Sequence, residues 1–192
     1  MCALPQLMPL SRQDYYDELI SHANGSPNSH WLAQMLASWL VGDGVLPDCL
    51  GLSQDQFQNM LQQTFPGYNL SPIAVSAHCT DFSRMLEKQD LEQLLRQSTH
   101  QPYAESEWLI SILVAACLGN DHLWQDLGLW NRSELSAMLN HNFPELATRN
   151  SKDMKWKKFL YKQLCEAEGL YVCRAPSCEV CKDYPQCFGP ED

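Results

Sequence analysis

Apolar residues recur at intervals of three and four along most of the chain, and the alternating pattern of a strand is nearly absent. The run from Trp108 to Leu118 is broken only by Ser111, which is typical of a buried helix. The other stretches each carry a single apolar stripe. Together they predict an all-α protein with helices within residues 11–25, 27–40, 53–61, 81–97, 108–118, 133–139 and 151–168.

Residues that start and stop helices support these boundaries. Ser11 is followed three positions later by Asp14, which is the pattern of a capping box, and Gly25 is placed to end the first helix. Pro27 suits a first helical turn, and Ser53 is a further candidate cap.

The segment 31–66 resembles the segment 108–144 at an offset of 77 residues, which becomes 78 after a one-residue insertion. The matched positions are large apolar residues and the glycines and prolines of turns. This predicts an internal duplication, two helix–turn–helix hairpins packed face to face as a bundle. Chance similarity between leucine-rich helices is the alternative. The identities of the first copy are Trp31, Leu32, Leu36, Gly42, Leu50, Gly51, Leu52, Met60, Leu61, Phe65 and Pro66.

Charge and length exclude several classes of protein. The chain has 192 residues, enough for one domain with a small appendage, and its formal charge of −10 disfavours a nucleic-acid partner. No apolar run reaches the roughly 18 residues that cross a membrane, and no signal peptide is visible. We therefore expect a cytoplasmic protein, in which the nine cysteines are thiols or metal ligands rather than disulfides.

Four cysteines crowd the end of the chain with the spacing Cys173-x4-Cys178-x2-Cys181-x5-Cys187. A short segment punctuated by prolines buries little on its own and needs a metal to fold. The sequence therefore predicts a helical domain over residues 1–168 and a metal-binding tail over residues 169–192.

Thiolates are soft ligands, so zinc and an iron–sulfur cluster are the main candidates. Structural zinc sites usually pair two C-x2-C knuckles, whereas this tail has one. The C-x4-C-x2-C triplet matches three ligands of plant-type ferredoxins and favours a cluster. Zinc, and redox thiols without metal, remain open alternatives.

Six of the thirteen basic residues fall between residues 149 and 162, just before the tail. One interpretation is a solvated basic face of the last helix. The other is that this charge offsets a thiolate-ligated cluster, attracts an oxyanion or docks an acidic partner. The six are Arg149, Lys152, Lys155, Lys157, Lys158 and Lys162.

The remaining candidate ligands are weaker. Cys165, eight residues before Cys173, is a candidate fifth thiolate, although a packing role is favoured. His78 and His122 are better explained as surface or core residues than as ligands. No P-loop, dinucleotide-binding motif or catalytic triad is visible, so we expect a protein that is not an enzyme. The cysteines expected to be free or core thiols are Cys2, Cys49, Cys79 and Cys117.

The basic-aromatic run of residues 153–166, followed by Gly169 and the four cysteines, resembles the NifQ family of molybdenum-trafficking proteins in nitrogen fixation. Segments 123–130 and 143–147 resemble the same family. The likeness covers at least residues 108–189, and residues 1–107 are identified through their length, order and duplication.

The resemblance implies a molybdenum–iron–sulfur cluster held by the four tail cysteines, with molybdate as the source of the metal. It also implies a role in supplying molybdenum for the nitrogenase iron–molybdenum cofactor. The implied partners are the nitrogenase iron protein and the NifEN scaffold. Aromatic residues of the tail, Phe188 among them, are expected to shield the cluster until docking.

Overall fold

The computed structural model describes residues 10–70, 85, 87–99, 104–167, 169 and 184–188. Within these ranges the chain forms helices and no strand, so the predicted all-α class is confirmed. No helix in them is both long and apolar enough to cross a bilayer. The helices are α1 (Arg12–Ser21), α2 (Pro27–Val41), the 3₁₀ helix η1 (Asp48–Gly51), α3 (Gln54–Thr64), α4 (Lys88–Gln97), α5 (Ala104–Ala116), α6 (Leu123–Asp126), α7 (Arg132–Asn142), α8 (Pro144–Arg149), α9 (Trp156–Ala167) and α10 (Tyr184–Cys187).

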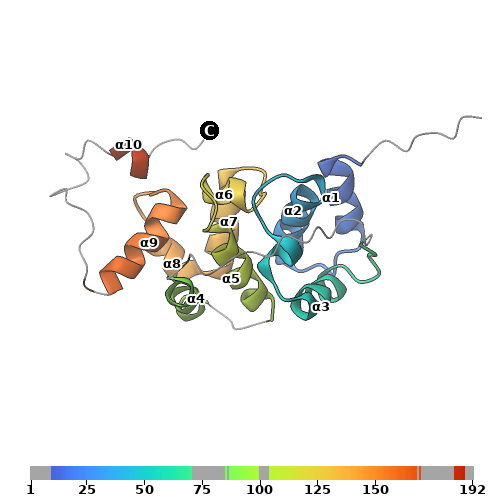
Figure 1. Ribbon diagram of the computed structural model, residues 1–192, viewed down its shortest axis with the longest axis horizontal. Helices are drawn as coiled ribbons and strands as arrows, with labels where there is room; N and C mark the ends of the chain where they lie inside the picture. The colour runs from blue at the N-terminus through green and yellow to red at the C-terminus, as the bar shows by residue number, and fades with distance from the viewer. Residues whose placement is uncertain are drawn as a thin grey trace, which may run out of the picture.

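The helices are arranged along the longest axis of the molecule (Figure 1). The first three, α1 to α3, lie at one end, and α5, α6 and α7 occupy the middle. The other end is formed by α4, α8 and α9, with α10 beside α9. Contacts of α4 with both α5 and α9, and of α8 with α7, join this end to the middle.

Several helix starts follow the sequence as predicted. The Ser11 hydroxyl accepts a hydrogen bond from Asp14 N (3.2 Å), and Ser11 N donates to the Asp14 carboxylate (2.8 Å). Ser53 caps α3 in the same reciprocal way, and Pro27 is the first residue of α2. Each cap satisfies backbone N–H groups that a helix N-terminus leaves without a partner.

Other boundaries differ from the predictions. The first helix ends at Ser21, four residues before Gly25. The helix expected over 81–97 begins at Lys88, and residues 81–84 and 86 lie outside the described residues. The predicted start at Ser133 moves to Arg132, because Asn131 provides the cap and accepts from Glu134 N (2.9 Å).

The last long helix also starts later than predicted, at Trp156 instead of Ser151. Residue Asp153 adopts a left-handed conformation (φ 54°), which a helix cannot contain. Arg132 holds it there through two hydrogen bonds to its carboxylate (2.8 and 2.9 Å). A tertiary contact therefore overrides the local helical pattern.

The core lies where the apolar stripes predict it. Every residue of 108–117 except Ser111 is buried, so α5 is the central helix of the bundle. The predicted stripe of α9 is buried as well, and so are three of the six tryptophans and all five described methionines. Examples with at most 8% exposure are Trp31, Met35, Met60, Trp108, Met138, Trp156, Phe159, Leu160 and Leu164.

The two related segments fold alike. Helices α2 and α5 begin 77 residues apart, and α3 and α7 match at both ends with an offset of 78. Each segment's second helix contacts the other's first, α3 with α5 and α7 with α2. At the second of these contacts the side-chain amides of Asn28 and Asn142 exchange two buried hydrogen bonds (2.9 and 3.1 Å). A common origin by duplication stays a prediction.

Candidate metal centre

Only one of the four predicted cluster ligands falls within the described residues. Cys187 ends α10, is half-buried and forms no disulfide with another described cysteine. Its side chain packs against the edge of the hydrophobic core. The other three ligands, Cys173, Cys178 and Cys181, lie outside the described residues, so the four-cysteine site remains a prediction.

The end of the tail is fixed to the helical body at the start of α9. Lys155 N donates a hydrogen bond to the Cys187 carbonyl oxygen (2.8 Å). The next residue, Phe188, is only 5% exposed and belongs to the main core. Phe188 therefore stabilises the attachment of the tail, and the shielding of a cluster by aromatic residues of the tail stays a prediction.

The loop that carries Lys155 is itself held in place. Asn150 accepts a hydrogen bond from Met154 N (2.8 Å) and donates one to the Met154 carbonyl (2.9 Å). On the outer side, Arg132 binds Asp153 as described above. Cys187 is therefore attached to a loop that hydrogen bonds from Asn150 and Arg132 hold in place.

Lys157, one of the six clustered basic residues, does not lie on the solvated face. Its side chain is 18% exposed and forms an ion pair with the carboxylate of Asp126, which is 1% exposed. Its ammonium group also donates to the Gly119 carbonyl (2.9 Å). Burial raises the pKa of Asp126 above its usual range, although the hydrogen bond and charge of Lys157 act in the opposite direction.

Close packing at this ion pair explains a glycine of the second segment. A β-carbon on Gly119 would lie 2.3 Å from the Asp126 carboxyl carbon. Since real contacts at that distance do not occur, only glycine leaves room for the carboxylate. Gly119 therefore lets the turn after α5 pack closely against Asp126 of α6 and Lys157 of α9.

Cys117 lies beside this ion pair and is a core thiol, as the sequence predicts. Its sulfur is buried, and burial raises its pKa to about 12 despite the nearby charge of Lys157. Burial also raises the pKa of Cys49. A thiol with a raised pKa is a poor metal ligand at neutral pH, because the thiolate is the form that binds. Cys2 and Cys79 lie outside the described residues.

The candidate fifth thiolate, Cys165, is half-buried near the C-terminal end of α9. Nine residues separate it from Trp156, or about 13 Å along the helix axis. Cys187 is attached at the opposite end of α9. Among the described residues no three His, Cys, Asp or Glu side chains form a group that could hold a metal. A ligand role for Cys165 therefore stays a prediction.

Neither candidate histidine gains support. His122 is the residue before α6, where its backbone N donates to the Gln125 side chain (3.2 Å). His78 lies outside the described residues.

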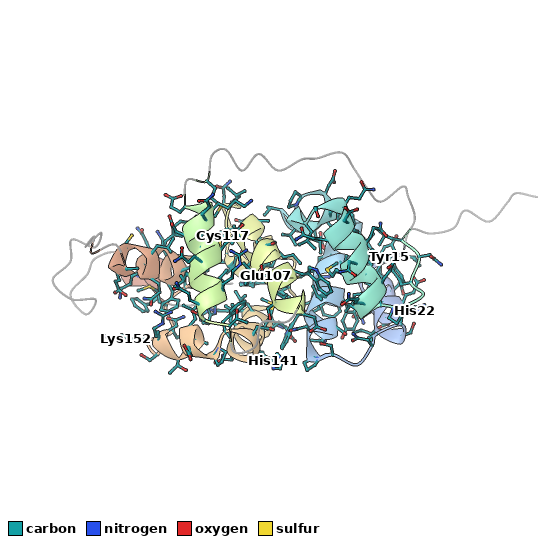
Figure 2. All side chains as sticks on the ribbon, turned by 90° about the horizontal axis from the view of Figure 1, so that it is seen from below. Tyr15, His22, Glu107, Cys117, His141 and Lys152 are labelled. Carbon is teal, nitrogen blue, oxygen red and sulfur yellow. The ribbon has the colours of Figure 1, made fainter. Side chains whose placement is uncertain are left out.

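The remaining basic residues do face solvent near the attachment of the tail. Lys152, Lys158 and Lys162 are exposed, as is Arg149, while Lys155 is half-buried. In Figure 2, Lys152 lies at the end of the molecule opposite Tyr15 and His22. Positive charge thus gathers at the same end as Cys187.

The sequence analysis missed the pairing of Asp126 with Lys157. A signal was present, because Asp126 stands in the largely apolar segment 123–129 and Lys157 lies between the buried Trp156 and the buried Phe159. Two opposite charges embedded in apolar segments indicate a buried pair.

Comparisons with known proteins identify the family. The family model described as NifQ matches residues 31–189. The chain belongs to the NifQ family. This membership confirms the resemblance found in the tail and connects the chain with nitrogen fixation.

The NifQ match includes both related segments, the Asp126–Lys157 pair and all four tail cysteines. Protein NifQ of Azotobacter vinelandii is 43% identical over 174 residues, which cover 85% of this chain and 89% of that protein. Protein NifQ of Rhodobacter capsulatus is 34% identical over 163 residues, covering 83% and 87%. The NifQ homolog of Sinorhizobium fredii is 35% identical over 158 residues, covering 82% and 68%. No solved structure matches the chain.

Proposed function

We propose that this protein is a metallochaperone that carries molybdenum on an iron–sulfur cluster and donates it for biosynthesis of the nitrogenase iron–molybdenum cofactor. The observation that supports it most is the spacing of Cys173, Cys178, Cys181 and Cys187 in a chain of the NifQ family. In this proposal the four thiolates hold the cluster, and the protein acts as a carrier rather than as an enzyme.

Ligand chemistry gives the reason for such a carrier. Molybdate presents its metal in a shell of hard oxide ligands, whereas the cofactor holds molybdenum among sulfides. A thiolate-ligated iron–sulfur cluster is a soft environment that can accept the metal. The tail would therefore keep molybdenum in a form that cofactor assembly can use.

The location of Cys187 suits delivery. The residue lies at the edge of the core, at one end of the elongated molecule, and exposed basic side chains surround the start of α9. A cluster held at the periphery can approach a partner without unfolding of the bundle. The partners in this proposal are the nitrogenase iron protein and the NifEN scaffold in the cytoplasm, and exposed positive charge would speed association with an acidic surface.

A nitrogenase assay in cells tests the proposal. A strain that lacks the protein should fix nitrogen poorly at low molybdate and recover when molybdate is raised, because mass action offsets a defect in supply. The control is the same strain carrying the wild-type gene. A defect that persists at every molybdate concentration would contradict a trafficking role and indicate an obligatory chemical step.

A further inference from the structure

An open pocket of about 380 Å³ lies beside the attachment point of the tail. It is bounded by the end of α8, the loop of residues 150–154, one face of α9, and Phe188. Met154, Phe159 and Phe188 supply its apolar surface. Because Phe188 directly follows Cys187, the pocket is adjacent to the last predicted cluster ligand.

The pocket concentrates positive charge in an acidic protein. Arg149, Lys152 and Lys162 line it, and Glu166 is its only carboxylate among the described lining residues. Lys162 forms an ion pair with Glu166 (3.5 Å), so the described lining residues keep an excess of two positive charges. The chain as a whole has 23 acidic and 13 basic residues, a net charge of −10. A local excess of this kind selects an anion.

The lining also supplies hydrogen-bond donors. The Arg149 guanidinium donates one hydrogen bond to the Ser98 hydroxyl (3.4 Å), which does not line this pocket, and it has further N–H donors. Ser151 and Gln163, which carry further polar groups, also line the pocket. Gln163 donates to Glu166 (2.8 Å), so the carboxylate is held by two neighbours, Lys162 and Gln163. Guanidinium, ammonium and hydroxyl donors together match the oxygens of a tetrahedral oxyanion.

The bonds described for the loop of residues 150–154 keep this arrangement in place. Asn150 and Met154 are bonded to each other at the pocket wall. Lys157 is turned away from the pocket into its pair with Asp126. Of the six clustered basic residues, Lys157 is therefore structural, and three line the pocket. The other two do not line it: Lys155, just before α9, and Lys158, on α9.

We infer that this pocket binds a doubly charged tetrahedral oxyanion and, resting on the proposed function, that the oxyanion is molybdate awaiting transfer to the tail. The pocket is roomy and open, so the bound ion keeps part of its hydration and exchanges freely. A larger ion loses less hydration energy when side chains replace its water, which favours molybdate over sulfate and phosphate.

Equilibrium dialysis of the full-length protein against molybdate tests the inference. The double variant Arg149→Gln/Lys152→Gln should weaken binding at least about tenfold, because each substitution removes a charge-assisted hydrogen bond. The single variant Lys152→Gln should show a smaller loss of molybdate binding. Because it changes only an exposed side chain, it tests the pocket even if the double variant misfolds. The matched control is Lys158→Gln, which removes an exposed charge from α9 outside the pocket and should bind like wild type.

Equal binding by the double variant and the Lys158→Gln control would overturn the site. Sulfate and phosphate that compete as well as molybdate would overturn the assignment to molybdate. The variant Cys178→Ala separates this inference from the proposed function. Molybdate binding that survives in Cys178→Ala supports the pocket, whether or not a cluster forms. Binding lost in Cys178→Ala but unchanged in the double variant would refute the pocket and leave the proposed function intact.

Discussion

Replacing Lys157 with methionine should destabilise the protein far more than replacing its neighbour Lys158. Methionine keeps most of the side-chain stem but removes the ammonium group. The Asp126 carboxylate, 1% exposed, then loses its ion-pair partner, and the Gly119 carbonyl loses a donor at 2.9 Å. A buried charge without a partner is the expected source of the loss.

The size of the effect follows from burial. Because Asp126 is enclosed and Lys157 is 18% exposed, water screens the pair only weakly. Removing one partner of a buried pair costs about 3–5 kcal/mol of unfolding free energy. For a chain of this length each kcal/mol lowers the melting temperature by roughly 2–4 °C, so the decrease should be roughly 6–20 °C. The Lys158→Met change at an exposed position should stay within about 0.5 kcal/mol.

The pH dependence provides a second readout. Burial raises the folded-state pKa of Asp126 above its unfolded value, and loss of Lys157 raises it further. A carboxyl group with a raised folded pKa contributes stability that is present at low pH and lost as pH rises through that pKa. The deficit of Lys157→Met should therefore shrink as pH falls from about 8 to about 5.

Urea denaturation of both variants followed by circular dichroism measures these differences. If Lys157→Met costs no more than Lys158→Met, the pair does not stabilise the fold. A deficit that grows as the pH falls would show that the carboxylate is not the destabilising group.

Two further outcomes are expected. The substitution Cys178→Ala should remove most of the iron while the helical circular dichroism persists, because among the described tail residues only Cys187 and Phe188 contact the core. Cys49→Ala, outside the tail, should keep its iron, and equal iron in both variants would contradict the ligand assignment. Burial, with smaller contributions from Cys117 and Glu87, raises the pKa of Tyr161 to about 12 in the folded protein. The protein should therefore lose stability between about pH 10 and 12, where the phenol ionises in the unfolded chain but stays protonated in the folded one. Subtracting the phenolate absorbance titration of Tyr161→Phe from that of wild type should leave a step near 12, and a step near 10 would refute the predicted burial.

Local signals in the sequence were sufficient for the class of fold. Ser11 and Pro27 act through neighbours in the same turn, so their roles can be read without a structure. The central position of α5 follows from an apolar run with one interruption, since such a helix has no face to turn to water.

Tertiary contacts account for what the sequence did not reveal. The start of α9 depends on Arg132, which lies 21 residues before Asp153 and holds it in a left-handed turn. Lys157 appeared to be one charge among six because its partner Asp126 is 31 residues away. Helical periodicity reports neighbours within one or two turns and cannot identify such partners.

For the candidate site, the sequence predicts the ligands but not where the last of them attaches. Cysteine spacing is the basis of the four predicted ligands, whereas the attachment of Cys187 to α9 depends on a backbone hydrogen bond that carries no sequence signal. The burial of Phe188 in the core was missed for a related reason. One aromatic residue in a short tail has no periodic pattern from which burial could be inferred.

Metal analysis of anaerobically purified protein distinguishes an iron–sulfur carrier from a zinc protein. The wild-type protein should be brown and contain iron and acid-labile sulfide, with molybdenum added when the cells or the purified protein receive molybdate. The Cys178→Ala variant should lose iron, sulfide and molybdenum together. Colourless protein that holds zinc in place of iron, although it comes from iron-replete cells, would refute the proposed function and favour a structural zinc site in the tail.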